Sequence, residues 1–170
     1  MKHLILTILS ALVLFSGCVS FSTTADWDPS ADFRGFKSFN FSQSFDEIKL
    51  IDLDKRRIKS AVTAEMEKRG YQLSDTPDLL INGYVTSKEK VVVTNTHYGG
   101  MSPYMWGPWY TSTDVNSYIE GTLLLSIIDI KQKKLIWEGK AEGITNSTGG
   151  DKRTREINEI INSMYRKYPI

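Results

Sequence analysis

The stretch of residues 118–130 constrains the fold more than any other part of this 170-residue chain. If the backbone there is extended, its apolar side chains fall on both faces of the strand. One face carries Leu123, Leu125 and Ile127, and the other carries Leu124, Ile128 and Ile130. A strand that is apolar on both faces usually lies in the interior of its sheet. The stretch therefore predicts a central strand, with a sheet built around it.

Four further segments show the alternation of a strand, namely residues 19–27, 37–42, 78–93 and 135–144. A four-residue polar turn separates the last of these from the central strand, and so short a connection predicts an antiparallel hairpin. The charged run Lys88-Glu89-Lys90 interrupts segment 78–93, which predicts a bent or bulged strand. Gly121 and Gly139 lie inside predicted strands, where glycine often marks close packing or a bulge.

Two segments show the 3.6-residue period of an amphipathic helix. The first is expected to begin at a cap formed by Asp52 or Asp54 and to end near Gly70. The second covers residues 153–167 and stops before Pro169. Two such helices can cover one face of a mostly antiparallel sheet of about four to five strands. The sequence therefore predicts an α+β fold, a two-layer sandwich with both helices on one face.

The first 17 residues predict an export signal. A basic start precedes an apolar run at residues 4–15, which is shorter than the roughly 20 residues that a membrane-spanning helix needs. The next residues complete the order Phe15-Ser16-Gly17-Cys18, which is similar to a bacterial lipobox and contains the only cysteine of the chain. We therefore expect a signal peptide at residues 1–17, a single domain at residues 18–170, and lipid attachment at Cys18. A small apolar residue of a plain signal or of a core is the alternative for Cys18.

The charge balance limits the partners of the mature domain. The chain has 21 lysines and arginines and 20 aspartates and glutamates, and Lys2 is the only one of these in the predicted signal. The mature domain is thus close to neutral and has no basic stripe, which argues against nucleic acid as a partner. Membrane attachment by charge is disfavoured for the same reason, so we expect attachment through the N-terminal lipid.

The residue after the cysteine bears on the location. Val19, and not an aspartate, follows Cys18. By the sorting rule for lipoproteins of enteric-type bacteria, this predicts the outer membrane more than the inner one, with the domain facing the periplasm. The alternation of the first predicted strand already begins at Val19, so we expect the folded domain to lie close to the bilayer.

The chain offers little for catalysis. His97 is the only histidine after the predicted signal and has no cysteine to share a zinc ion with, and no Gly-x-Ser-x-Gly nucleophile elbow occurs. Asp26, Asp28 and Asp32 carry oxygen ligands that suit calcium, but Asp28-Pro29 is more typical of a turn. We therefore expect no catalytic residue, no metal and no cofactor. A hydrolase is the weaker alternative.

One stretch, residues 94–117, is unusual and is expected to be a long loop. It is rich in glycine, proline and aromatic residues and contains no lysine, arginine or glutamate. Three interpretations are open: a satellite core folded onto its own domain, a contact with the membrane surface, or a site for a sugar or a partner protein. For a binding site, the candidate residues are Tyr104, Trp106, Trp109 and Tyr110.

Several short motifs occur in an order that is similar to a known family. After the lipid cysteine come Asp26-Trp27-Asp28-Pro29, Asp32-Phe33, the YIEGTL segment at 118–123, the LIWEGKA segment at 135–141, and Tyr168-Pro169. This ordered set resembles the bacterial lipoprotein family catalogued as domain of unknown function four-one-three-six. The resemblance covers nearly the whole mature chain. It implies an exported, lipid-anchored α+β domain without an assigned activity, and it supplies no functional residue beyond the lipid cysteine.

These observations lead to one functional expectation and one alternative. We expect a lipid-anchored accessory or interaction protein of the cell envelope, with an envelope protein as its partner. The alternative is a binding module for an envelope ligand, either lipid, glycan or peptide, that uses the aromatic loop as its site.

Overall fold

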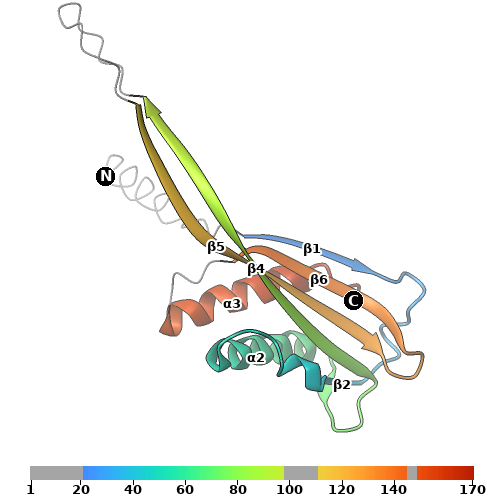
Figure 1. Ribbon diagram of the computed structural model, residues 1–170. Coiled ribbons are helices and arrows are strands. Elements are labelled where there is room, and N and C mark those ends of the chain that lie inside the picture. Colours follow the sequence, from blue (N-terminus) through green and yellow to red (C-terminus); the bar gives the residue numbers. More distant parts are fainter. Residues whose placement is uncertain (1–20, 98–110, 145–148) are drawn as a thin grey trace, which may run out of the picture.

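The computed structural model describes residues 21–97, 111–144 and 149–170. Two α-helices and six strands follow one another in these residues, with one short 3-10 helix between β2 and α2 (Figure 1). Their bounds are β1 (Ser22–Trp27), β2 (Ser38–Phe41), η2 (Gln43–Phe45), α2 (Asp52–Lys68), β3 (Gln72–Leu73), β4 (Leu79–His97), β5 (Thr111–Asp129), β6 (Lys134–Ile144) and α3 (Gly150–Tyr165).

All six strands form one mixed sheet in the order β1-β6-β5-β4-β2-β3. The pairs β1–β6, β6–β5 and β5–β4 are antiparallel, whereas β2 runs parallel to both β4 and β3. Both helices lie on the same face of the sheet (Figure 1), so the predicted α+β class is confirmed. The strand that was not predicted is β3, because two residues are too short to show a period. β5 lies between β6 and β4, as its apolar pattern predicted.

β4 and β5 form a long hairpin that continues past the two-layer body (Figure 1). They pair without a register shift from Leu79 opposite Asp129 to His97 opposite Thr111. The bulge predicted as one alternative at Lys88-Glu89-Lys90 is therefore wrong, because backbone pairing continues there whatever the polarity of the side chains. The expected loop at 94–117 is also shorter than predicted, since residues 94–97 and 111–117 are paired strand.

The core lies between the helices and one face of the sheet. Leu125 and Ile127 of β5 are fully buried on this face, and Val62, Met66 and Ile161 of the helices are fully buried opposite them. The other apolar face of β5 is only partly covered by its own neighbours: Tyr84, which pairs with Leu124, is 62% exposed. In the described residues, both helices pack on the face that carries Leu125 and Ile127. Neither of them covers the other face of β5, although β5 lies inside the sheet.

The two glycines singled out in the predicted strands have the expected roles. A register shift between β5 and β6 falls next to Gly121, where the extra residue is Gly143 of β6. A Cβ atom on Gly139 would lie 2.3 Å from Cη2 of Trp137, far closer than two carbon atoms can approach. Gly139 therefore leaves the space into which the indole ring of Trp137 packs.

Candidate binding cleft

The residues that the sequence proposed for lipid attachment and ligand binding lie outside the described part of the chain. These are Cys18, Tyr104, Trp106, Trp109 and Tyr110. His97 is described as the last residue of β4. The predicted lipid and aromatic sites therefore stay predictions, and the site built below comes from other residues.

The aspartates considered for calcium serve the turn after β1. Oδ1 of Asp28 accepts hydrogen bonds from the backbone N–H of Ser30 at 2.8 Å and from its hydroxyl at 2.6 Å. The carboxylate also pairs with Lys134, and this ammonium group together with Ser30 lowers the pKa of Asp28 to about 2. Within the described residues, no group of three or more His, Cys, Asp or Glu side chains is placed to hold a metal ion.

An apolar cleft of about 930 Å³ lies between the helices and the sheet, close to where the long hairpin leaves the body. This volume is near the upper end of the range of about 300–1,000 Å³ that small-molecule sites occupy. Its apolar walls come from the segment before α2, both helices, and strands β4, β5 and β6. They are formed by Ile48, Leu50, Ile58, Val85, Leu123, Ile144, Ile157, Ile160 and Ile161. We refer to this feature as the cleft.

One wall of the cleft depends on a glycine in β4. A Cβ atom on Gly83 would lie 2.6 Å from Cδ1 of Ile48 and 2.8 Å from Cε2 of Phe45. The missing side chain therefore lets η2 and the segment after it approach the sheet. Phe45 is fully buried by this approach, and it fixes the segment that carries Ile48 and Leu50 into the cleft wall.

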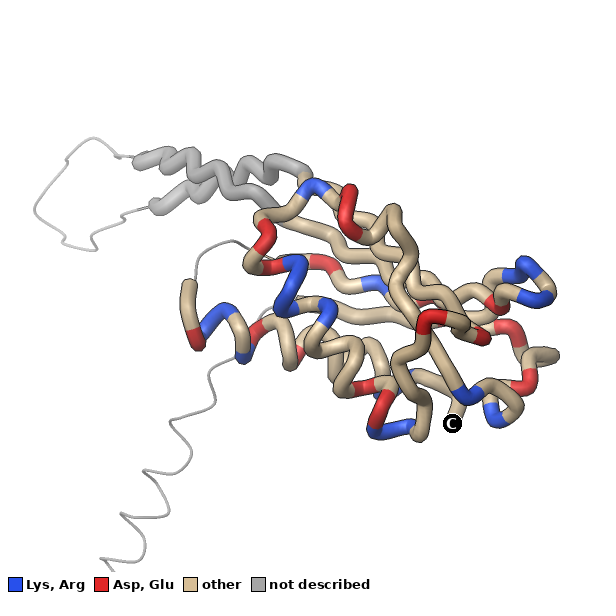
Figure 2. Tube along the Cα trace, turned by 90° about the horizontal axis from the view of Figure 1, so that it is seen from below, with Lys and Arg blue, Asp and Glu red and all other residues tan. Residues whose placement is uncertain are grey.

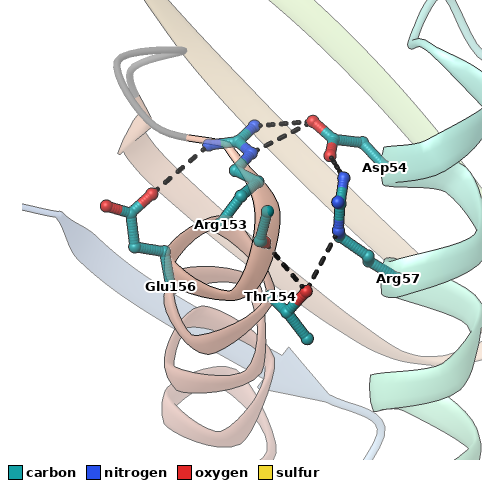
Figure 3. A network of polar contacts seen from close by, with 6 residues as sticks. Asp54, Arg57, Arg153, Thr154 and Glu156 are labelled. Carbon is teal, nitrogen blue, oxygen red and sulfur yellow. Dashed lines mark hydrogen bonds and ion pairs between the residues drawn. The ribbon is translucent and has the colours of Figure 1, made fainter.

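A buried ionic network borders the cleft through Arg153. Figure 3 shows the network. Nε and Nη2 of Arg153 donate to Oδ2 of Asp54 at 3.1 and 2.9 Å, and Nη1 of Arg57 donates to Oδ1 at 2.8 Å. Nε of Arg57 also donates to the hydroxyl of Thr154, and Glu156 lies 3.7 Å from Arg153. Asp54 and Arg153 are only 4% and 5% exposed. The buried charge of Arg153, which lines the cleft, is thus neutralised within the network.

This network corrects the predicted helix cap. The N-cap of α2 is Ile51, which makes no side-chain capping hydrogen bond, whereas Asp52 and Asp54 lie in the first helical turn. Asp54 does not cap the helix because two guanidinium groups already take both of its carboxylate oxygens. Its role is to join the first turn of α2 to the first turn of α3.

A second contact joins the same helices near their C-terminal ends. The carboxylate of Glu65 accepts hydrogen bonds from Lys68 at 2.6 Å, Arg69 at 2.7 Å and Asn162 at 3.2 Å. Burial alone would raise the pKa of Glu65, but these donors outweigh it and hold the pKa below its usual value. Nη2 of Arg69 also donates to the carbonyl of Tyr165 at 2.5 Å. The helices run parallel and are joined to each other near both ends.

Residues from three of the family-like motifs meet in an aromatic cluster beside α3. The ring of Tyr168 lies 5.3 Å from that of Phe33 and 5.5 Å from that of Trp137. Tyr71 donates a 2.8 Å hydrogen bond to the carbonyl of Phe33, and Tyr165 is fully buried. Burial raises the pKa of all three tyrosines, so none is an acid or base near neutral pH. These motif residues hold the fold together.

The charged side chains of the helices are mixed in sign, and the buried ones are paired. Basic and acidic residues are interspersed over the two helices (Figure 2), and the buried charges at the cleft are paired with one another. The sequence placed residues 153–167 in an amphipathic helix that packs on the sheet, and Ile157, Ile160 and Ile161 belong to this helix. The sequence did not predict the cleft, because the apolar face of a helix does not show how completely the side chains of the sheet fill the space opposite it.

One family model matches most of the chain, and one solved structure shares its fold. The sequence model of a family described as "Domain of unknown function (DUF4136)" matches residues 23–170. A search of curated proteins gives no match. Among solved structures, a PDZ domain protein from Parabacteroides distasonis ATCC 8503 is similar with a TM-score of 0.53 and 21% identity, over 88% of this chain and 35% of that one. The chain thus spans about a third of that protein, and the likeness concerns the fold alone. The PelC dodecamer from Paraburkholderia phytofirmans gives a TM-score of 0.47 and 11% identity, over 85% of this chain and 97% of that one.

Proposed function

We propose, from the premise that this chain belongs to the DUF4136 family, that it is a lipid-anchored protein of the bacterial cell envelope that binds an apolar ligand. The family description assigns no activity, so the proposal comes from the geometry of the domain. The observation that carries it is the cleft of about 930 Å³ between α2, α3 and the sheet.

The proposed anchor is supported by the sequence and by the start of the fold. Cys18 follows an apolar run and two small residues, in the manner of a lipobox. β1 begins at Ser22, and four residues of extended chain span at most about 14 Å. A lipid on Cys18 would therefore hold the sheet next to the bilayer, which we propose to be the outer membrane, with the domain facing the periplasm. No helix in the described residues is long and apolar enough to cross a membrane.

The proposed binding activity is supported by the construction of the cleft. Its walls are largely aliphatic, and the helices that form two of them are joined by an ion pair at their N-terminal ends and by hydrogen bonds near their C-terminal ends. A rigid, largely apolar pocket with a few polar groups is the usual form of a small-molecule site. We propose binding without catalysis, because Asp54, Arg57 and Arg153 hold one another in place at this site.

The aromatic segment is a second candidate site. β4 and β5 remain paired for ten residues past Ser87, which carries their far ends about 33 Å from the body. The proposed site residues Tyr104, Trp106, Trp109 and Tyr110 belong to the segment that joins those ends. A hairpin of this length favours contact with something outside the domain, either the membrane surface or an envelope partner.

The anchor is tested by replacing Cys18 with alanine in the full chain. We expect the wild-type protein to incorporate labelled palmitate and to sediment with membranes, and the Cys18→Ala variant to do neither. A variant from which residues 1–17 have been removed, and which still sediments with membranes, would contradict the anchor.

The cleft is tested with a photoreactive alkyl diazirine added to the full-length acylated protein in lipid nanodiscs. Peptide mass spectrometry should find adducts on the segments that carry Leu123 and Ile157. The Val85→Trp variant, in which an indole occupies the cleft, should lose them. Leu124→Trp places the same ring on the opposite face of the sheet and should keep them. Equal labelling of the two variants would contradict the proposal.

A further inference from the structure

The geometry points to a bilayer phospholipid as the ligand of the cleft, with one acyl chain inserted between the helices and the sheet. This inference rests on the proposed function, because it requires both the anchor and the cleft. It adds the chemical class of the ligand and the place from which the ligand enters.

The first step is the position of the cleft relative to the start of the chain. Ser22 of β1 pairs with Glu142 of β6, and Glu142 in turn pairs with Thr122 of β5. Thr122 lines the cleft, as do its neighbour Gly121 and the residue paired with Gly121, Ile144. β1 therefore begins two strands away from the cleft, a distance of about 10 Å across the sheet.

The second step is the reach of the anchor. Cys18 lies no more than about 14 Å of extended chain from Ser22. The hydroxyl of Thr23 in β1 is hydrogen-bonded to that of Ser163 at 2.9 Å, so β1 begins beside the C-terminal half of α3. The cleft extends along Ile157 and Ile161 to Arg153, which is about 15 Å from Ser163 along the helix. A bilayer that holds a lipid on Cys18 is therefore within reach of the cleft.

The third step is the chemistry of the walls. The walls of the cleft are aliphatic, so they match a methylene chain and offer no stack of aromatic rings for a sugar. Burial of a methylene group contributes about 0.8 kcal/mol relative to water, whether the group enters the cleft or the bilayer. The free energy therefore changes little when an acyl chain moves from the bilayer into the cleft. Such a transfer requires that the cleft lies at the membrane surface.

The fourth step concerns the polar groups of the cleft. Glu47, Lys49 and Ser87, all exposed, line it together with the aliphatic residues. The ammonium group of Lys49 and the hydroxyl of Ser87 donate hydrogen bonds, and the phosphate and ester oxygens of a phospholipid accept them. Apolar walls next to such donors suit an amphiphile better than a pure hydrocarbon.

The acyl chains on Cys18 are the other source of the same chemistry. A tethered group reaches an effective concentration in the millimolar range, whereas the lipids of the adjacent bilayer are present in large excess over it. The higher concentration of bilayer lipids therefore favours occupation of the cleft by an acyl chain from the bilayer.

The experiment uses the full-length acylated protein in nanodiscs that contain a phospholipid with a diazirine in its acyl chain. Irradiation should place adducts on the peptides that carry Leu123 and Ile157. Val85→Trp should reduce their yield about ten-fold, and Leu124→Trp should leave it unchanged. Circular dichroism confirms that both variants are folded before they are compared.

A second arm separates the sources of the chain. Protein carrying a diazirine-labelled acyl group on Cys18 is placed in unlabelled nanodiscs and irradiated. Labelling of the cleft peptides from this group, without labelling from the bilayer lipid, would overturn the proposal in favour of the anchor itself. Labelling by the free alkyl diazirine but by neither lipid would overturn the phospholipid proposal. The proposed function, binding of an apolar ligand, would still hold. If the free alkyl diazirine, the labelled bilayer lipid and the labelled acyl group on Cys18 all fail to label the cleft, both the phospholipid proposal and the proposed function are contradicted.

Discussion

Asp54 and Arg153, 99 positions apart in the chain, join the first turns of α2 and α3 through two hydrogen bonds to one carboxylate oxygen. Both side chains are buried, and Arg57 takes the other oxygen of Asp54. Because Arg153 also lines the cleft, the contact that orients the helices also shapes the end of the site.

Replacement of Asp54 by alanine should destabilise the protein strongly. The change leaves two guanidinium groups without their carboxylate, and removal of one partner from a buried ion pair costs about 3–5 kcal/mol. Asp52→Ala in the same helical turn is the matched control, because the Asp52 side chain is 84% exposed and its pair with Lys55 contributes under about 1 kcal/mol. Urea unfolding of the full chain measures both. Equal losses would show that the network does not hold the helices.

Replacement of Gly139 by alanine should also destabilise the fold. The new methyl group would meet the indole of Trp137, and overpacking of this kind costs about 1–3 kcal/mol. Gly149→Ala serves as the control, since no atom lies within 4 Å of a Cβ atom built there. Thermal unfolding should show a clearly lower midpoint for the first variant. Similar midpoints would mean that the sheet can move away from Trp137.

The stability of the domain should fall on acidification, in part through Glu65. Its pKa is held below the usual 4.5 in the folded protein, so its ionised form stabilises the fold above the unfolded pKa. This contribution is lost as the pH falls through the folded pKa. Glu65→Gln should therefore weaken the dependence of the unfolding free energy on pH below about 5. The exposed neighbour Glu67 provides the control variant Glu67→Gln. Identical pH profiles for wild type and Glu65→Gln would refute the assignment.

The sequence predicted those features of the fold that depend on local periodicity. The alternation within residues 118–130 placed β5 inside the sheet, and the helical stripes placed α2 and α3 on one face. Gly139 was recognised because a glycine inside a strand often marks a place where another group packs closely against the backbone. β3 was missed because its two residues cannot display a period.

Features that depend on distant partners could not be predicted in the same way. Asp54 has the sequence position of a cap, and only the fold brings Arg153 to it. The cleft was missed because Ile157 and Ile161 fit a filled core as well as a pocket wall. Gly83 could have been recognised from the sequence, because it is a glycine in a predicted strand. It marks the place where Ile48 approaches the sheet closely.

The central claim, that the cleft holds an apolar ligand in the cell envelope, is tested most directly by native mass spectrometry of the full-length protein extracted from its own membranes. We expect wild type and Leu124→Trp to carry a non-covalent lipid in addition to the acylated chain, and Val85→Trp to carry none. A wild-type mass equal to that of the acylated chain alone, or the same bound lipid on Val85→Trp, would contradict the account.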